Sequence, residues 1–365
     1  MSLTNWNVKT CCSNEKKLIL RVLKDILIKK ERSNEVLMKV RRNIDLKNQN
    51  ISVEWISFIK PIGESPRSRK SVAGEHFSKD FYRQDLKNGL ISSYTRFKPV
   101  TDCMFITAEP GSFIYTSKTD DDEVCGIFFL AGPDQKVEIN FLTFDIPCEH
   151  RGLISVVDGW ELNGEVFPSE MDHRLPLKQR SSEFCGKNIG AKRSFTSSQN
   201  AAVIRYRIPK PGKGFTLFAK FLKNPRPCNV LAASVDEPYT LRNYGRRINC
   251  TYVALYPGTV HVIALGVGVS NFLGATRTTE TGTLRKCDET SPHDQVIIGG
   301  SDGLDTSKVQ IVDSICGIDS KPDYRELVEY GVTSVRLVSS GFYENSVTVQ
   351  VKPLKNELLD ANLSI

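Results

Sequence analysis

Apolar and polar residues alternate with a period of two in several short segments of this chain. Segment Val137–Phe141 places apolar side chains at every second position, and segments 204–208, 215–219 and 347–351 repeat the pattern. A half-buried β-strand requires this alternation. Turn residues interrupt these segments about every 8 to 12 positions, and helical periodicity is rare. The pattern predicts an all-β fold built from antiparallel β-sandwiches.

The N-terminal part of the chain follows a different pattern. Charged side chains interrupt the apolar segment 18–28 at near-helical spacing, which predicts a short amphipathic helix within residues 15–30. Residues 45–102 mix charges with proline and glycine and include the basic run Arg67–Lys70, a composition typical of a linker. We therefore expect residues 1–102 to form a basic, partly disordered leader and linker.

The cysteine spacing indicates an internal duplication. Cys103 and Cys125 are 22 positions apart, and so are Cys228 and Cys250, at an offset of 125 residues. Two further cysteines follow each pair. The eight positions are Cys103, Cys125, Cys148 and Cys185 in the first half and Cys228, Cys250, Cys287 and Cys316 in the second. Because a solenoid repeats every few tens of residues, this longer period predicts one domain per repeat, at 103–226 and 227–354, before a tail at 355–365.

The same spacing favours disulfides over a metal site. Zinc sites usually contain two cysteines that are two to four residues apart, and this chain has no such pair. Disulfides persist in oxidising compartments, so we expect a secreted, extracellular protein. Four cysteines per module allow three pairings, and the equal loops favour the sequential one. The expected bonds are Cys103–Cys125, Cys148–Cys185, Cys228–Cys250 and Cys287–Cys316. Cys11 and Cys12 receive no function.

Composition and charge narrow the possible partners. The hydrophobic fraction of 40% and the charged fraction of 25% are ordinary for a globular protein, and no apolar run is long enough to span a membrane. Residues 1–102 carry 21 Lys and Arg against 11 Asp and Glu, net +10, whereas the remaining residues carry 28 against 31, net −3. The modules thus lack the basic face that nucleic-acid binding requires, and we expect no nucleic-acid partner.

The leader does not contain an export signal of the usual kind. Such a signal needs an uninterrupted apolar core of about 7 to 15 residues, and charges break the best candidate at Arg21, Lys24 and Asp25. We therefore expect that residue 1 is not the start of the secreted product.

Two local motifs bear on chemistry. Segment Gly299–Gly303 matches G-x-S-x-G, but no long amphipathic helix follows it, as a hydrolase nucleophile elbow requires. We interpret it as a glycine-rich turn, with an esterase that uses Ser301 as the weakest alternative. The scattered histidines form no H-E-x-x-H motif, so no enzyme and no cofactor are expected. Asn249-Cys250-Thr251 is a glycosylation sequon inside a module.

Several ordered motifs carry a resemblance to known proteins. Segments Cys125–Phe129, Val137–Phe141 and Leu153–Gly159 resemble part of a CUB domain, an extracellular β-sandwich. A longer series is similar in order and spacing to the corticotropin-releasing factor-binding protein family over residues 94–354. This series includes Asp158-Gly159-Trp160, Phe167-Pro168-Ser169, Asp172-His173, Ser197-Ser198-Gln199-Asn200, Asn249-Cys250, Gly303-Leu304-Asp305 and Val335–Gly341. The resemblance implies two tandem, disulfide-bonded CUB-like β-sandwiches.

The resemblance also implies a function. It indicates a secreted protein that sequesters a peptide hormone of the corticotropin-releasing factor type and limits its access to a receptor; in an invertebrate the related diuretic hormone would be the ligand. Bound as an amphipathic helix, such a peptide needs a hydrophobic groove. The candidate contact residues combine aromatic and basic groups near the start of the first module; an exposed connector is the alternative interpretation. They are Tyr94, Arg96, Phe97, Lys98 and Phe105.

The competing hypothesis is a CUB-type adhesion or protease-accessory protein that binds its partners through calcium. Calcium-binding CUB domains place carboxylates before the Asp-Gly turn and in a later loop. Here the corresponding positions in the first module are Gly152 and Arg207–Pro209, and Asp294 is the one nearby acid in the second. We therefore expect peptide binding without calcium. The family's late disulfide is also absent, because Tyr330 stands at its first position and no cysteine follows Cys316.

Overall fold

The computed structural model describes residues 38–44, 51–57, 97–162, 164–187, 193–268, 282–285, 287 and 294–354. The predicted helix within 15–30 and the tail lie outside these residues. A separate unit, Leu27–Arg96, contains an antiparallel hairpin of β1 (Met38–Ile44) and β2 (Ile51–Ser57). The linker prediction did not include this hairpin.

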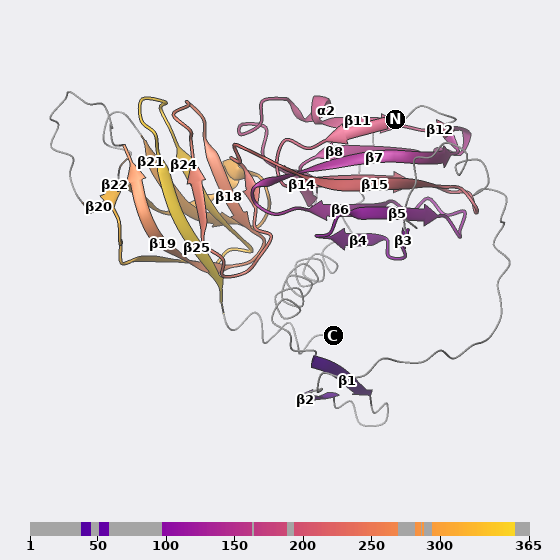
Figure 1. Cartoon of the computed structure of the whole chain (residues 1–365), viewed down its shortest axis with the longest axis horizontal. Helices are drawn as coiled ribbons and strands as arrows, with labels where there is room; N and C mark the ends of the chain where they lie inside the picture. The colour runs from indigo at the N-terminus through magenta and orange to yellow at the C-terminus, as the bar shows by residue number, and fades with distance from the viewer. Residues whose placement is uncertain are drawn as a thin grey trace, which may run out of the picture. The chain divides into compact units, whose positions relative to one another are not determined.

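The first module is a sandwich of two sheets (Figure 1). Sheet A has the order β11-β8-β14-β6-β4, and sheet B has the order β12-β7-β15-β5-β3 with β13 also on β7. Sheet A contains β4 (Met104–Thr107), β6 (Cys125–Leu130), β8 (Leu153–Asp158), β11 (Ser181–Phe184) and β14 (Ala201–Arg207). Sheet B contains β3 (Lys98–Pro99), β5 (Gly111–Thr116), β7 (Gln135–Ile146), β12 (Gly186–Lys187), β13 (Arg193–Thr196) and β15 (Gly214–Lys223). Shorter elements are η2 (Cys148–His150), the hairpin of β9 (Trp160–Leu162) and β10 (Glu165–Phe167), and α2 (Leu177–Arg180).

The core of this sandwich follows from the alternation in β7 and β15. Val137, Ile139 and Phe141 are buried against sheet A, and the polar residues between them face outward. The ring of Phe141 contacts Phe184 and Phe215 edge-on, at centroid distances of 5.2 and 5.8 Å. Apolar burial of this kind is the main stabilising contribution to a fold, and the predicted all-β fold is confirmed.

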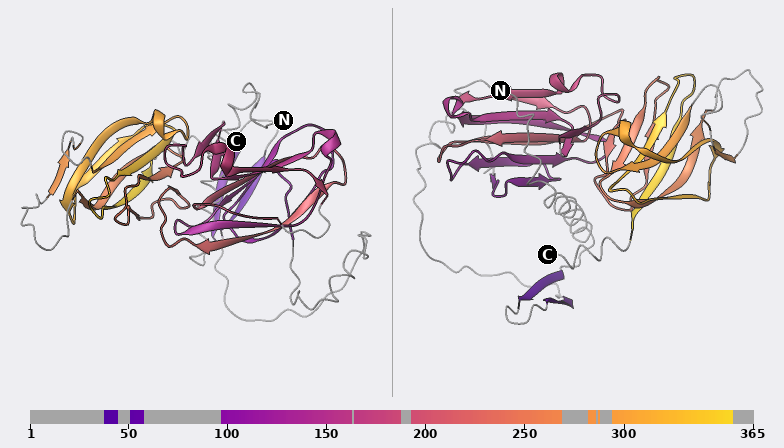
Figure 2. Two further views of the ribbon diagram at one scale, coloured as in Figure 1. Left: turned by 90° about the horizontal axis from the view of Figure 1, so that it is seen from above. Right: turned by 180° about the vertical axis from the view of Figure 1, so that it is seen from behind.

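The second module is one continuous sheet that folds into two layers (Figure 2). Its order is β16-β18-β24-β21-β22-β19-β25-β17, with β20 on β22 and β23 on β19. The strands are β16 (Val230–Leu231), β17 (Tyr239–Arg242), β18 (Cys250–Ala254), β19 (Gly258–Val267), β20 (Gly282–Arg285), β21 (Gln295–Ser301), β22 (Gln310–Asp319), β23 (Tyr324–Val328), β24 (Val332–Val338) and β25 (Ser346–Pro353), with η4 (Thr306–Lys308) after β21. Strand β22 pairs with β21 over residues 310–315 and with β19 over 317–319, so it joins the two layers around a shared apolar core.

The strand order repeats between the modules, as expected for an internal duplication. The order β11-β8-β14-β6-β4 in the first module corresponds to β22-β21-β24-β18-β16 in the second. In each series the last two strands, β4 with β6 and β16 with β18, are parallel. A two-residue hairpin cannot join parallel strands, and each pair is instead connected through an intervening strand, β5 in the first module and β17 in the second.

Four disulfides join the eight module cysteines in the order in which they occur along the chain: Cys103–Cys125, Cys148–Cys185, Cys228–Cys250 and Cys287–Cys316. Each of the bonds Cys103–Cys125 and Cys228–Cys250 joins a cysteine just before the first strand of a parallel pair to the first residue of the second strand. By the loop-entropy relation such a bond stabilises the fold by about 3 kcal/mol.

The central strands of sheet A, β6, β8 and β14, are buried on both faces. In β6, Ile127 and Phe129 face the sandwich core, while Phe128 and Leu130 face a second apolar cluster. That cluster also contains Leu231, Val253, Leu255, Leu304 and Val332 of the second module. A strand buried on both faces has a continuous apolar run rather than an alternating one, which explains the run at 127–130. The two modules therefore share one apolar interface.

Replacing Leu231 by alanine is expected to lower the free energy of unfolding by about 2 to 5 kcal/mol, because it opens a cavity in this interface. Leu231 is 0% exposed, and the buried Trp160 lies in the same cluster, so tryptophan fluorescence during urea unfolding provides the measurement. The control is Leu222→Ala at a position that is 37% exposed, for which we expect a change within about 0.5 kcal/mol. Equal effects of the two substitutions would contradict the assigned role of Leu231.

Candidate functional site

A buried ion pair connects the modules at Asp172. The Asp172 side chain is 0% exposed, and its Oδ1 accepts a hydrogen bond from Nη2 of Arg336 in β24 at 2.6 Å. Its Oδ2 accepts from Oγ1 of Thr306 at 3.0 Å, and its backbone oxygen accepts from Nδ2 of Asn229 at 2.9 Å. A buried charge is tolerated when it is paired and hydrogen-bonded in this way. Asp172 therefore fixes how the two modules dock.

The glycine-rich turn of the second module holds a carboxylate of the first. Oε2 of Glu165 accepts hydrogen bonds from the backbone N–H groups of Leu304 and Asp305 at 2.7 and 3.1 Å. A Cβ at Gly303 would lie 2.0 Å from that oxygen, so glycine permits the close approach. Nζ of Lys308 donates to Oε1 of Glu165 at 2.7 Å, and this hydrogen bond raises the pKa of Lys308.

The G-x-S-x-G motif is thus part of the interface rather than a nucleophile elbow. The Ser301 hydroxyl donates to the Gly303 carbonyl at 2.6 Å and is buried at the end of β21. The element that follows is the three-residue η4. The turn interpretation agrees with this geometry.

Asn200 connects the modules through backbone groups. Its Nδ2 donates to the carbonyl oxygens of Ala131 and Leu231 at 3.1 and 2.7 Å, and its Oδ1 accepts from the Leu231 N–H at 3.0 Å. Asn200 is 0% exposed, so these bonds satisfy amide atoms that have no access to water.

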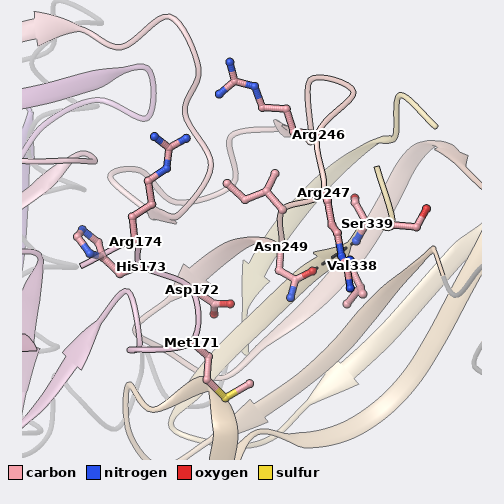
Figure 3. Close-up of a pocket in the computed structure, with 11 residues that line it drawn as sticks. Met171, Asp172, His173, Arg174, Arg246, Arg247, Asn249, Val338 and Ser339 are labelled. Atoms are coloured by element: carbon pink, nitrogen blue, oxygen red, sulfur yellow. Dashed lines mark hydrogen bonds between the residues drawn. The ribbon is translucent and has the colours of Figure 1, made fainter. Parts of the chain in front are cut away.

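Beside these contacts lies a cleft of about 720 Å³ (Figure 3). Met171–Arg174 of the first module form one wall. Arg246–Asn249 and Val338–Ser340 of the second module form the other. Because Asp172 belongs to the first wall, the ion pair with Arg336 also fixes the shape of the cleft.

The cleft is cationic. Arg174, Arg246 and Arg247 are exposed, and none of them has an acidic partner among the residues that the structure describes. Asp172 is the acidic residue of the lining, and its carboxylate is committed to Arg336. The surroundings are also apolar, because Met171 is 69% exposed and Phe342, two residues after Ser340, is 80% exposed. The cleft can therefore accept groups that are both acidic and apolar.

His173 has a structural role in the first wall. Its Nε2 lies 3.2 Å from Oδ2 of Asp158 and 3.0 Å from Oγ of Ser198, and its Nδ1 lies 3.0 Å from the Leu175 backbone nitrogen, which donates to it. The side chain is 6% exposed. These contacts hold the wall in place and leave no free imidazole nitrogen.

A buried polar network orders the opposite wall. Oδ1 of Asp294 accepts from the Ser340 N–H and its Oδ2 accepts from Nδ2 of Asn345, both at 2.6 Å. Oδ1 of Asn345 accepts from the Gly268 N–H at 2.9 Å, while Nδ2 of Asn243 donates to the Tyr343 carbonyl at 2.7 Å. The loop that carries Ser340 and Phe342 is held by these bonds.

Two carboxylates lie near the positions at which the sequence comparison with calcium-binding CUB domains looks for calcium ligands. Both accept hydrogen bonds from other groups of the protein. Asp294 is 2% exposed and bonded as above, and Oδ1 of Asp158 accepts from the Ser198 N–H at 2.7 Å. Among the described residues, a group that could hold a metal is Cys103, Glu123 and Cys125. Both of its sulfurs form a disulfide, so they cannot act as thiolate ligands.

The contact residues expected from the sequence lie elsewhere in the first module. Tyr94 and Arg96 are outside the described residues, and Phe97 is half-buried just before β3. Nζ of Lys98 pairs with Glu109 at 2.6 Å, and the ring of Phe105 packs against Phe113 at 6.0 Å. The described members belong to the edge strands β3 and β4 or precede them, and they do not line the cleft.

Sequence reasoning did not identify the cleft arginines. Arg246 and Arg247 are adjacent and follow a turn-forming segment, a visible signal of an exposed basic pair. Arg174 is 72 positions earlier, and only the docking of the modules brings it to the same cleft.

The sequon asparagine also lies on the cleft wall. Oδ1 of Asn249 accepts from the Ser339 N–H at 3.4 Å, and the residue is half-buried. The sequon hydroxyl belongs to Thr251, which is 0% exposed in β18. Glycosylation of Asn249 would therefore have to precede the folding of β18.

Comparisons with known proteins follow the two modules. The family model for the corticotropin-releasing factor binding protein N-terminal domain matches residues 95–223, and that for the C-terminal domain matches residues 230–360. The corticotropin-releasing factor-binding protein of Rattus norvegicus is 33% identical over 264 residues, which cover 71% of this chain and 79% of that protein. The Homo sapiens protein is 32% identical, and the match covers 69% of this chain and 76% of that protein. The Xenopus laevis protein is 30% identical, and the match covers 76% of this chain and 82% of that protein.

Among solved structures, the CUB1-EGF-CUB2 domains of rat MASP-1 match with 11% identity over 69% of this chain and 100% of that chain, at a TM-score of 0.24. The full extracellular region of zebrafish Gpr126/Adgrg6 matches with 13% identity, at a TM-score of 0.26. This match covers 71% of this chain and 38% of that chain. None of the described helices has the length and apolar character needed to cross a membrane.

Replacing Asp172 by alanine is expected to lower the free energy of unfolding by about 3 to 5 kcal/mol, because it leaves the Arg336 guanidinium in the interface without its partner. Arg336 is 13% exposed. Thermal and urea unfolding provide the measurement, and Asp302→Ala at an exposed position of the same interface turn is the control. If the two variants unfolded alike, Asp172 would not stabilise the docking of the modules.

Asn249 is predicted to carry a glycan when the protein is made in secretory cells. The expected result is a mass difference between the parent and an Asn249→Gln variant that glycosidase treatment removes. Identical masses before and after treatment would show that the sequon is unused.

Proposed function

The chain belongs to the corticotropin-releasing factor-binding protein family, and we propose that it binds a peptide hormone of the corticotropin-releasing factor type and limits the access of that hormone to its receptor. The family consists of binding proteins rather than enzymes. The observation that carries the proposal is the match of both modules to the family, together with a cleft whose walls come from both.

The chemistry of the cleft supports a peptide ligand. An amphipathic helix binds through an apolar face that enters a groove, and peptide segments of this kind also present charged side chains at the edge of that face. The cleft is lined by the exposed side chain of Met171 and by three guanidinium groups that form no ion pair with a described residue, and the exposed Phe342 lies two residues after Ser340 of its wall. Hydrogen bonds hold its walls before binding, and this reduces the loss of conformational entropy when a ligand binds.

We propose a second contact surface at the start of the first module. It comprises Tyr94, Arg96, Phe97, Lys98 and Phe105. The described members lie at or next to β3 and β4, which are edge strands of sheets B and A. An edge strand can pair with an extended peptide segment, so this surface would contact a part of the ligand outside the cleft.

The proposal includes secretion into an extracellular space. Four disulfides connect the described module cysteines, and such bonds are stable in oxidising compartments. In an invertebrate, the ligand we propose is the related diuretic hormone.

Labelled peptide of the corticotropin-releasing factor type is expected to bind the full chain saturably, with the same Kd in calcium and in EDTA. The reason is that the Asp158 and Asp294 carboxylates are occupied by protein hydrogen-bond donors. Fluorescence anisotropy of the labelled peptide provides the measurement, and a scrambled peptide of equal charge is the control.

Two outcomes would overturn this proposal. No saturable binding would exclude the peptide-binding function. A tenfold weaker Kd in EDTA, equivalent to about 1.4 kcal/mol, would favour the alternative of a calcium-dependent CUB-type adhesion or protease-accessory protein.

A further inference from the structure

We propose that Arg174, Arg246 and Arg247 form a subsite for the carboxylate side chains of the bound peptide, with Met171 and Phe342 contacting the apolar residues next to them. This inference rests on the proposed function and specifies its ligand as an amphipathic peptide with an acidic edge.

The three arginines are distinguished by lining one cleft without an ion pair to a described residue; other exposed arginines without an ion pair, such as Arg242 and Arg325, are not among the lining residues of that cleft. The arginines that form ion pairs are Arg151 with Asp122, Arg205 with Glu161, Arg285 with Asp313 and Glu326, and Arg336 with Asp172. Arg174, Arg246 and Arg247 form none with a described residue, and all line one cleft. Like charges that share a cleft repel each other, and a bound carboxylate relieves that repulsion.

The protein does not neutralise the cleft from within. The Asp172 carboxylate is 0% exposed and bonded to Arg336, so it cannot reach the cleft arginines without breaking the interface. Asp294, behind the opposite wall, is bonded to Ser340 and Asn345. The described residues therefore provide no carboxylate for the three arginines, and an acidic ligand can supply one. Guanidinium groups suit this role because their planar donors match the geometry of a carboxylate.

The apolar surroundings favour a peptide over a purely anionic ligand. Phe342 and Met171 have the highest exposures among the large apolar side chains of the described residues, 80% and 69%. Met171 lies in the first wall, and Phe342 lies in the loop that forms part of the second. A methionine side chain adapts to different apolar partners. Acidic groups adjacent to apolar groups, as on one edge of an amphipathic helix, match this combination.

The test is a cycle of two proteins and two peptides. Labelled peptide of the corticotropin-releasing factor type, and the same peptide with its acidic residues changed to amides, are titrated against the parent and against the triple variant Arg174→Gln, Arg246→Gln, Arg247→Gln. The control variant removes the same charge at exposed positions outside the cleft, with Lys210→Gln, Lys220→Gln and Arg325→Gln. Circular dichroism and the urea midpoint verify that each variant is folded.

We expect the parent to bind the amide peptide at least roughly tenfold more weakly than the acidic peptide, equivalent to about 1.4 kcal/mol. The triple variant should bind both peptides with the same weak affinity, and the control variant should retain the preference of the parent. Arg246→Gln alone, compared with Arg325→Gln alone, gives a second measurement if the triple variant is unfolded.

Three results would overturn the subsite. The triple variant could retain the preference for the acidic peptide, or it could weaken both peptides by the same factor. The third result combines two observations: both peptides bind the parent equally, and heparin displaces peptide from the parent but not from the triple variant. That result would assign the arginines to the binding of a sulfated polysaccharide. Absence of any peptide binding to the parent is a different failure, because it contradicts the proposed function itself.

Discussion

The burial of the central strands of sheet A on both faces is the interaction on which the rest of this structure depends. One face closes the core of the first module, and the other packs against Leu231, Val253 and Val332 of the second. Without the second module, side chains such as Phe128 and Leu130 would be exposed as an apolar patch, which a soluble domain normally avoids. The two modules are therefore coupled, and the cleft exists because they dock in one arrangement.

Polar contacts determine which arrangement that is. Apolar packing is non-directional, whereas the Asp172–Arg336 pair, the Glu165 contact with the glycine-rich turn and the Asn200 bonds each require particular atoms to meet. A buried polar group that loses its partner costs about 1 to 3 kcal/mol. A sliding of one module over the other would incur several of these costs together, so the walls of the cleft have a defined separation.

The sequence predicts the modules better than the site. Strict alternation at Val137–Phe141 identifies β7, and the repeated cysteine spacing indicates two copies of one topology. The continuous apolar run at 127–130 was a signal of two-sided burial, but a run of this length is also compatible with a core strand inside one domain. Asp172-His173 stood out as a family motif without indicating a role. The role of Asp172 comes from Arg336, which is 164 positions later and reaches it only through the docking of two modules.

In the second wall of the cleft, hydrogen bonds between protein groups order a loop. A calcium ion at this place would need several oxygen ligands, carboxylates among them. Here Asp294 instead accepts hydrogen bonds from Ser340 and Asn345, and Asn345 in turn accepts one from Gly268. Both Asp294 and Asn345 are nearly or fully inaccessible to solvent, so these bonds form in a medium of low dielectric constant, where they are electrostatically stronger than in water. The loop that carries Phe342 is therefore ordered before a ligand arrives. Affinity in the cleft then depends on the contacts of the exposed arginine and apolar side chains, since neither the loop nor the docking of the modules has to be reorganised on binding.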